Sequence, residues 1–326
     1  MRTVLLTGAT GFLGGHVARS LAREGWRVRA IARDLGRAQR LAAEGVEIRP
    51  GDLSRTADLE SAALGCDAIV HVAGLVKART LEDYREVNLR GTENLLRAAS
   101  KAAPGALFLL VSSQAAAGPA RDGRPVSESD PARPVSWYGL SKREGEEAVA
   151  RMWPGAWIVL RPAVVYGPED RGLLVLFRAA ARGFLPAAGG RRRIQLIEAG
   201  DAALAIARAA SRRDLSGRTG FLADPAPIAI ADFCGALARV PSRRPLVVPI
   251  PDFSVRVAGW LETIVETLTR RSLPFNADKA REILAGDWLC DTLPMRADLQ
   301  LPAPTPLEDG LLSTWKWYVD SGWLIL

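Results

Sequence analysis

The chain has 326 residues, of which 48% are hydrophobic and 24% are charged, so it can bury a large core and is not a disordered chain. Its length fits a large α/β domain with a smaller appended lobe. The net charge of +7 suits an anionic cofactor or substrate, and since no recognised nucleic-acid-binding motif accompanies this charge, we expect no nucleic-acid partner.

Short strand-like runs alternate with amphipathic stretches through the first half of the chain. We predict strands over Thr3–Thr7, Arg27–Ala32, Val46–Pro50, Ala68–Val72, Ala106–Val111 and Trp157–Arg161. Amphipathic helices are predicted over Gly14–Glu24 and Leu89–Lys101. This alternation predicts a Rossmann-type, doubly wound parallel sheet in an α/β fold.

The second half is less regular, being richer in Pro and Gly. Gly118–Val135 is predicted to be a loop over the site, and helices are predicted over Leu173–Arg182 and Asp201–Ser211. The aromatic residues of the tail, Pro306–Leu326, are expected to serve packing. We therefore predict a dinucleotide-binding domain over residues 1–170 and a smaller substrate-binding lobe over residues 171–326, interleaved with the first.

The stretch Asp252–Arg271 has apolar residues at helical spacing from Phe253 to Leu268. Packing against the core is the expected role of this helix. An apolar substrate lid and a helix on a membrane surface remain alternatives. Peripheral membrane contact and a homodimer therefore stay open.

The N-terminus and the cysteines indicate a cytoplasmic protein. The first apolar run, Thr3–Leu6, is too short for the core of a signal peptide, and no run of about 20 apolar residues predicts a transmembrane helix. Cys66, Cys234 and Cys290 are odd in number and widely spaced, so they predict neither a metal site nor a disulfide framework.

A glycine-rich segment follows the first predicted strand and opens the first predicted helix. Its glycines, Gly8, Gly11 and Gly14, permit a tight turn and a close approach of the backbone to a diphosphate. Thr10, Phe12 and Leu13 lie between them, where the first N–H groups of the helix can face the anion. The segment predicts a bound nicotinamide dinucleotide.

Tyr138 and Lys142 lie four residues apart on a predicted helix, so both side chains can meet one substrate. A neighbouring ammonium favours the phenolate and lowers the pKa of a tyrosine. The phenol can then exchange a proton with a carbonyl or hydroxyl group while a hydride moves to or from the nicotinamide.

These motifs together resemble the extended branch of the short-chain dehydrogenase/reductase superfamily, which includes NAD(P)-dependent epimerases and dehydratases and 3β-hydroxysteroid dehydrogenase-like enzymes. The glycine spacing and the Tyr-x-x-x-Lys pair carry this resemblance, and Arg161–Pro168 matches the family's Arg-Pro-x-x-x-Tyr-Gly-Pro. The resemblance implies that Ser113 hydrogen-bonds the reacting oxygen and that Lys142 also holds the nicotinamide ribose.

Further cofactor contacts are implied by the resemblance alone. Asp52, with Leu53 beside it, would meet the adenine, and Asn88 would lie near the nicotinamide. Val72, Ala73 and Gly74 would form the floor beneath the cofactor, with His71 structural rather than catalytic. Backbone at Pro162, Val164 and Val165 would run along the nicotinamide.

The end of the second predicted strand bears on the choice between NADP and NAD. An acid there would bind the ribose 2′-hydroxyl of NAD, whereas an arginine would pair with the 2′-phosphate of NADP. The strand ends in Ala32 and Arg33, which favours NADP(H) over NAD(H), although Asp34 keeps NAD possible.

Three functions share these motifs. The expected one is an NAD(P)-dependent oxidoreductase that interconverts a carbonyl and a hydroxyl group on a lipophilic, steroid-like substrate. A sugar-nucleotide epimerase or dehydratase is the alternative, for which Arg191–Arg193 could clamp a diphosphate or could be a solvated loop. The third is a non-catalytic dinucleotide-binding subunit, against which the intact Ser113, Tyr138 and Lys142 argue.

Overall fold

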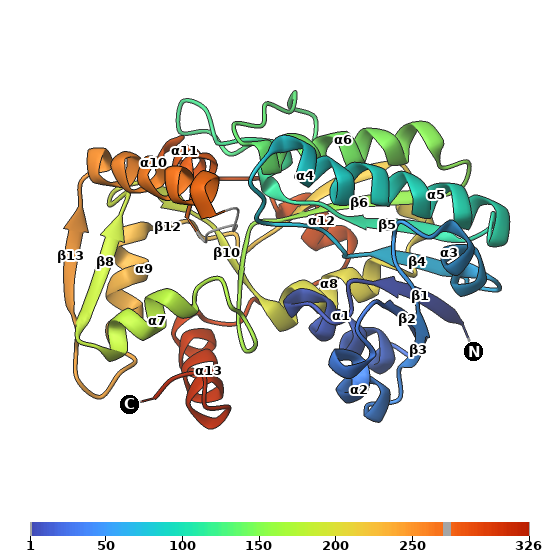
Figure 1. Cartoon of the computed structure of the whole chain (residues 1–326), viewed down its shortest axis with the longest axis horizontal. Coiled ribbons are helices and arrows are strands. Elements are labelled where there is room, and N and C mark those ends of the chain that lie inside the picture. Colours follow the sequence, from blue (N-terminus) through green and yellow to red (C-terminus); the bar gives the residue numbers. More distant parts are fainter. Residues whose placement is uncertain (1, 270–274, 326) are drawn as a thin grey trace.

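A computed structural model describes residues 2–269 and 275–325 of the chain (Figure 1). Within this described part, seven parallel strands form the central sheet in the order β11-β6-β5-β4-β1-β2-β3. The strands are β1 (Thr3–Thr7), β2 (Arg27–Ala32), β3 (Glu47–Pro50), β4 (Ala68–His71), β5 (Leu107–Val111), β6 (Trp157–Pro162) and β11 (Arg218–Leu222). The predicted doubly wound parallel sheet is thus confirmed, and a seventh strand comes from the second half of the chain.

Helices cover both faces of this sheet. One face packs against α1 (Phe12–Arg23), α2 (Leu35–Ala43) and α8 (Ala199–Ala209), and the other against α3 (Thr56–Ala63), α5 (Gly91–Ala102) and α6 (Trp137–Met152). Strand residues alternate between the two cores. Leu6 and Val70 face the first, whereas Leu5 and Ile69 face the second. The central strands are therefore buried on both sides, as parallel strands require.

A smaller lobe follows and closes over the carboxyl edge of the sheet (Figure 1). In the described residues it contains three two-stranded sheets, formed by β7 (Val164–Tyr166) with β10 (Leu196–Glu198), β8 (Phe184–Ala188) with β13 (Leu246–Ile250), and β9 (Arg193–Ile194) with β12 (Ile228–Ala229). Its core packs α7 (Leu174–Ala181), α9 (Ile230–Leu237) and α13 (Leu307–Asp320). The aromatic tail serves this packing, since Tyr318 is fully buried among Phe177, Trp317 and Trp323. The boundary expected at residue 170 stays a prediction.

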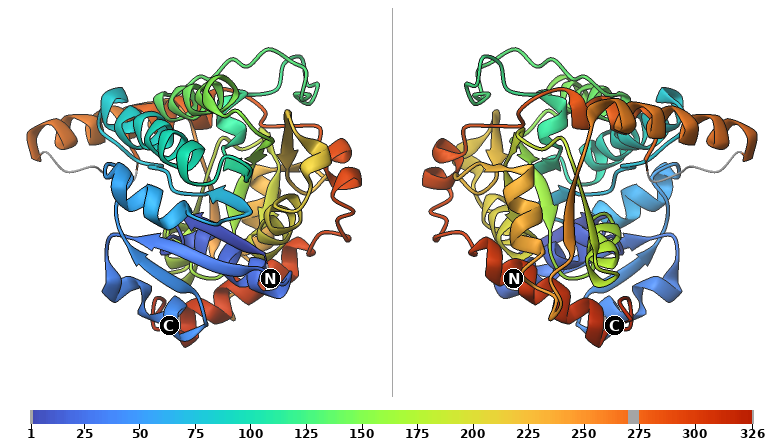
Figure 2. Two further views of the ribbon diagram at one scale, coloured as in Figure 1. Left: turned by 90° about the vertical axis from the view of Figure 1, so that its right-hand side faces the viewer. Right: turned by 90° about the vertical axis from the view of Figure 1, so that its left-hand side faces the viewer.

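Two further helices, α10 (Asp252–Thr269) and α11 (Ala277–Leu284), pack against each other beside the start of α6. In both views of Figure 2, α10 (orange) extends beyond the body of the molecule. Arg270 and Arg271, which the sequence placed at the end of this helix, lie outside the described residues. No helix among the described residues is long and apolar enough to cross a membrane.

Several boundaries differ from those predicted. Helix α1 begins at Phe12 rather than Gly14, because Gly11 is extended and precedes it directly. The helix predicted from Leu89 begins earlier, as α4 (Leu81–Arg85) and a π-helical turn (Glu86–Arg90) run continuously into α5. Residues 118–135 form the predicted loop, which is tied to the smaller lobe where Val126 bridges to Cys290. The three cysteines are buried and unpaired, as expected.

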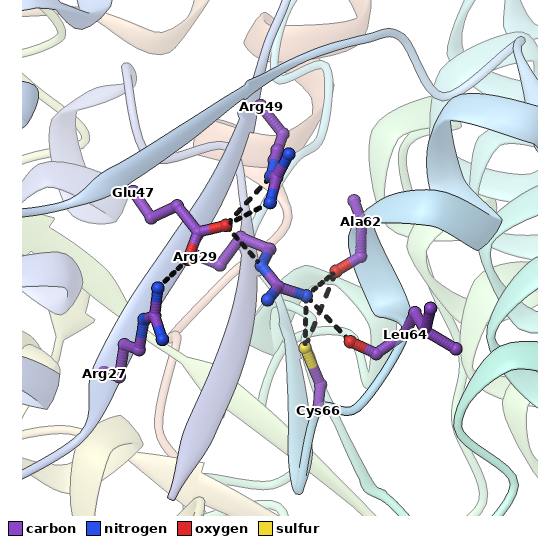
Figure 3. Close-up of polar contacts among 7 residues, drawn as sticks. All are labelled: Arg27, Arg29, Glu47, Arg49, Ala62, Leu64 and Cys66. Carbon is purple, nitrogen blue, oxygen red and sulfur yellow. Dashed lines mark hydrogen bonds and ion pairs between the residues drawn. The ribbon is translucent and has the colours of Figure 1, made fainter. Parts of the chain in front are cut away.

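Glu47 on the edge strand β3 pairs with three arginines of β2 and β3 (Figure 3). Arg27, Arg29 and Arg49 all pair with its carboxylate, at 3.1, 3.0 and 2.7 Å. Arg29 also donates through Nη1 to the carbonyl oxygens of Ala62 and Leu64, at 2.8 and 2.9 Å. It therefore satisfies the free carbonyl groups at the end of α3 and joins that helix to β2.

Arg29→Met is expected to lower the free energy of unfolding by about 1–3 kcal/mol, because it leaves two helix carbonyls and part of the Glu47 carboxylate without donors. Arg27→Met is the matched control, since the side chain of Arg27 is 61% exposed and makes one surface ion pair. That change is expected to cost at most about 0.5 kcal/mol. Urea unfolding measures both, and equal losses would contradict the bridging role of Arg29.

Candidate active site

The glycine segment lies where β1 and β4 are neighbours, at the point where the strand order reverses. Gly8 has φ +77°, and a Cβ atom there would lie 2.6 Å from the backbone nitrogen of Ala73. A Cβ on Gly14 would lie 2.0 Å from the carbonyl oxygen of Gly8. Both positions therefore exclude any side chain, and the loops after β1 and β4 approach as closely as two backbones can.

Helix α1 begins at this loop with its first N–H groups open. Gly11, which precedes the helix, donates its own N–H to the Gly8 carbonyl at 2.9 Å and offers no side chain to cap the N–H groups that follow. Thr10 and Phe12 flank it, and Leu13 packs against the core. The free helix end and the absent side chains form a cradle that fits the diphosphate of a dinucleotide.

His71 ends β4 beneath this cradle and is fully buried. Its Nδ1 hydrogen-bonds the hydroxyl of Thr7 at 2.6 Å, and its Nε2 hydrogen-bonds that of Thr92 at 2.9 Å. Burial, with a smaller effect of the nearby Lys142 charge, lowers the pKa of His71 to about 3, so the ring is neutral at physiological pH. It joins β1, β4 and α5, which agrees with the structural role that the sequence implied.

Asn88 joins the loop after β4 to helix α6. Its Nδ2 donates to the Leu75 carbonyl at 3.0 Å and to the Ser141 hydroxyl at 2.9 Å, and its Oδ1 accepts from the Leu75 N–H at 2.7 Å. A Cβ on Gly74 would lie 3.2 Å from that Oδ1. Asn88 therefore shapes the floor formed by Val72, Ala73 and Gly74 and sets its distance from the catalytic helix.

Tyr138, Lys142 and Ser113 converge at the carboxyl end of β5. Ser136 caps α6 by accepting from the Gly139 N–H at 3.0 Å, and Tyr138 lies in the first turn. Lys142 is buried and donates to the Val111 carbonyl at 2.8 Å. Ser113 follows β5 directly, and its hydroxyl is close enough to the phenol of Tyr138 to lower its pKa, so all three residues lie at the carboxyl end of this strand.

Burial governs the ionisation of these groups. It raises the pKa of Tyr138 to about 12 against the opposing hydrogen bond from Ser113, and it lowers the pKa of Lys142 to about 8 against the attraction of Glu146. The expectation that Lys142 lowers the pKa of Tyr138 is not met in this structure, because desolvation dominates and the ammonium donates to the Val111 carbonyl. The phenol is therefore protonated at neutral pH.

Arg161 lies at the end of β6 and pairs with Glu146 of α6 inside the protein. Nε and Nη2 of the arginine lie 2.8 and 2.6 Å from the two carboxylate oxygens, and both side chains are less than 5% exposed. This pair holds β6 against the catalytic helix. Pro162, Val164 and Val165 continue from it into β7, beside the site, where their cofactor contacts stay a prediction.

The end of the cradle where the adenosine is predicted to bind is bordered by charged residues between β2 and α2 and in the loop after β3. Arg33 is 80% exposed and lies 3.5 Å from Asp52, whose carboxylate also caps the turn at Ser54. Leu53 packs against Gly91. Asp34 caps α2 by accepting from the Arg37 N–H at 3.1 Å, so its carboxylate is already engaged.

Two neighbours of this site were missed by the sequence analysis. Arg37 of α2 reaches the Thr10 carbonyl of the glycine segment at 3.4 Å. The sequence feature that could have identified Arg37 is its position four residues after Arg33. Asp278 of α11 accepts from the N–H groups of Trp137 and Tyr138, at 2.8 and 3.4 Å. No local signal could have found it, since 140 residues separate it from Tyr138.

Among the described residues, no group of His, Cys, Asp or Glu side chains is arranged to hold a metal ion.

The chain resembles solved structures over nearly its whole length. It superposes on UDP-glucose 4-epimerase from Thermotoga maritima with a TM-score of 0.77 and 18% identity, covering 98% of this chain and 99% of the other. MoeE5 in complex with UDP-glucose and NAD gives a TM-score of 0.77 at 23% identity, with the same coverage. These similarities concern the fold.

Sequence comparisons extend the likeness to named enzymes. The chain is 37% identical to the ceramide reductase of Caulobacter vibrioides over 98% of its own length and 96% of that protein. It is 31% identical to a farnesyl-dihydroquinoline-oxide ketoreductase of Stigmatella aurantiaca, over 84% and 82% of the two chains. The model of the NAD dependent epimerase/dehydratase family matches residues 4–219, from β1 into β11. The chain therefore belongs to this family, the extended branch of the short-chain dehydrogenases/reductases, and is an NAD(P)-dependent oxidoreductase.

Proposed function

We propose that the chain reduces the ketone of a lipophilic substrate to a secondary alcohol with NADPH. The arrangement of Ser113, Tyr138 and Lys142 at the end of β5 carries this proposal, because it combines a hydrogen-bond donor with a phenol that keeps its proton at neutral pH. A protonated phenol is suited to donate to a carbonyl oxygen, which is the acid step of reduction.

The reaction follows from these positions. A reduced nicotinamide held at the glycine cradle and the floor of Val72, Ala73 and Gly74 would supply the hydride for the carbonyl carbon. The carbonyl π-electron pair moves to oxygen, which takes the proton of Tyr138. Ser113 accepts an N–H from Ala115 at 3.2 Å, and its hydroxyl proton would turn from the Tyr138 phenol to hydrogen-bond the same substrate oxygen. The charge of Lys142 stabilises the phenolate until solvent returns the proton.

The charges of the smaller lobe favour an uncharged substrate over a sugar nucleotide. Of the three consecutive arginines that could clamp a diphosphate, Arg192 pairs with Asp252 at 2.5 Å and Arg193 pairs with Asp287 at 2.7 Å. Two of these guanidinium groups are therefore neutralised within the protein. Gln114, which follows Ser113, also supplies no acid or base for a dehydration. The ceramide reductase and ketoreductase relatives bear names consistent with this choice.

Tyr138→Phe is expected to lose about 10²- to 10⁴-fold in kcat for ketone reduction while keeping its affinity for NADPH, because only the proton donor is removed. Ser113→Ala should fall between this variant and the wild type. Lys142→Ala should lose activity and also bind NADPH more weakly. Turnover with a panel of lipophilic ketones and cofactor titration measure these effects, and UDP-glucose in the same panel tests the epimerase alternative.

Tyr84→Phe is the matched control, since this phenol is buried 6.0 Å from the ring of Tyr138 but lies outside the group. Its activity should remain near that of the wild type. With the pKa of Tyr138 near 12 and that of Lys142 near 8, the reduction rate should be flat below neutral pH and fall above about pH 8, where Lys142 loses its charge. The oxidation rate should rise with pH, since oxidation needs the phenolate. A Tyr138→Phe enzyme with full activity would show that the proton comes from elsewhere.

We also propose that NADPH is preferred to NADH, with Arg33 and Arg37 as the residues that pair with the 2′-phosphate. Arg33 is exposed, Arg37 reaches the glycine segment at Thr10, and the capping role of Asp34 keeps its carboxylate from a ribose. Arg33→Ala and Arg37→Ala should each weaken NADPH binding about 10-fold or more and leave NADH binding unchanged.

Titration of tryptophan fluorescence with each cofactor measures the two affinities. Arg97→Ala serves as the control for lost positive charge, because Arg97 lies on α5 in an exposed ion pair with Glu93. Equal NADPH affinity in Arg33→Ala, Arg37→Ala and the wild type would remove the phosphate-binding role from this pair.

A further inference from the structure

Helix α10 exposes a continuous apolar stripe. Its members are spaced three and four residues apart, so they share one face of the helix. Trp260 is 61% exposed and Leu268 is 78% exposed. The stripe consists of Phe253, Val257, Trp260, Leu261, Ile264, Val265 and Leu268. The expectation that this stretch packs into the core is therefore wrong for this face.

The opposite face of α10 makes the packing contacts. Val255 and Glu266 are buried there, and a Cβ on Gly259 would lie 2.7 Å from the Cβ of Ala280 on α11. This close approach fixes which way the helix is turned. The apolar stripe consequently points away from α11 and from the body of the molecule, from which α10 extends in both views of Figure 2.

The charges of α10 are distributed unequally around it. Its acids are engaged with other parts of the chain: Asp252 with Arg192, Glu262 with the N–H of Phe275, and Glu266 with Asn276. Arg256 is exposed at the border of the apolar stripe. Asp252 is 45% exposed one turn before Arg256 but is paired with Arg192, so the apolar stripe itself carries no acid and has Arg256 at its border.

A second arginine lies beside Arg256. Arg256 and Arg281 both line a groove of about 700 Å³ between α10 and α11, whose other walls include Val135, Ala277, Ala280 and Leu284. Arg281 is paired with Asp278 at 3.6 Å, which leaves Arg256 as the arginine of this groove that can face a phosphate. The apolar stripe and the adjoining Arg256 match the two layers of a membrane surface, acyl chains and anionic headgroups.

We propose that α10 is an interfacial helix, which lies in the surface of an anionic lipid bilayer with its apolar stripe among the acyl chains and with Arg256 at the lipid phosphates. A second copy of the chain is the less suitable occupant, because its own apolar stripe would offer no carboxylate to Arg256. The helix lies on the bilayer and does not cross it, since four charged residues interrupt it.

This binding would deliver substrate to the catalytic helix. Asp278, on the helix that packs against α10, accepts the first N–H groups of α6, so the bilayer-facing helices border Tyr138. A lipophilic ketone could pass from the membrane to the site without crossing water. This part rests on the proposed ketone reduction, whereas binding of α10 to the bilayer does not.

Flotation of the full-length protein with vesicles tests the proposal. The wild type should float with vesicles of phosphatidylcholine and phosphatidylglycerol, and less with phosphatidylcholine alone or at high salt. Trp260→Glu with Leu268→Glu should weaken binding about tenfold or more, whereas Trp260→Phe should retain it. Leu246→Glu is the matched control, since Leu246 is 69% exposed on β13, outside the apolar stripe, and should bind as the wild type does.

The double variant should keep its circular dichroism spectrum and its turnover of a water-soluble ketone, because both substituted side chains are exposed on the face of α10 that makes no packing contact with α11. A wild type that fails to float with anionic vesicles would overturn the proposal. So would a wild-type dimer that the double variant converts to a monomer, since a second copy would then cover the apolar stripe. Loss of ketone reduction in every assay, with vesicle binding intact, would refute the proposed function alone.

Discussion

The close approach of the backbones at Gly8 and Ala73 is the constraint on which the rest of the site depends. A Cβ at Gly8 would lie 2.6 Å from the Ala73 nitrogen, so the loops after β1 and β4 can meet only because a side chain is absent. Thr7, His71 and Thr92 join the two strands to α5 just below. The open N-terminus of α1 and the floor beneath the nicotinamide are thereby held in one place, and a diphosphate can be bound by backbone N–H groups.

The catalytic helix α6 is anchored to this frame from several directions. Asn88 joins it to the loop after β4, and the buried pair of Arg161 and Glu146 joins it to β6. Asp278 holds its first turn from the smaller lobe. Tyr138 and Lys142 thus keep a defined position relative to Ser113, which proton transfer to a bound oxygen requires. Desolvation keeps the phenol protonated, which suits reduction better than oxidation at neutral pH.

The net charge of +7 does not show which arginines are available to bind an anion. Many arginines are paired within the protein, including Arg29 with Glu47, Arg192 with Asp252 and Arg193 with Asp287. Arg37 lies beside the glycine cradle, Arg33 makes only a long and exposed contact of 3.5 Å to Asp52, and Arg256 lies beside the apolar stripe of α10. Anion recognition in the proposed functions depends on these residues, because a guanidinium already paired with a carboxylate has little affinity left for a phosphate.

Local patterns in the sequence determined the parallel sheet, the cradle and the catalytic group. The alternation of apolar runs predicts the bounds of β1 to β6 to within one residue. The turn at Gly8 and the spacing of Tyr138 and Lys142 depend only on residues within one or two helical turns of chain, so the sequence shows them directly.

Tertiary structure alone decided what depends on distant residues. Only the folded chain shows that β11 joins the sheet and that Asp278 accepts from the start of α6. It also shows that Asp252 and Asp287 pair with Arg192 and Arg193. The tertiary structure also buried Tyr138 enough to raise its pKa, and it turned the apolar residues of α10 outward. Helical spacing shows that a helix has two faces, but only its packing partner determines which face is buried.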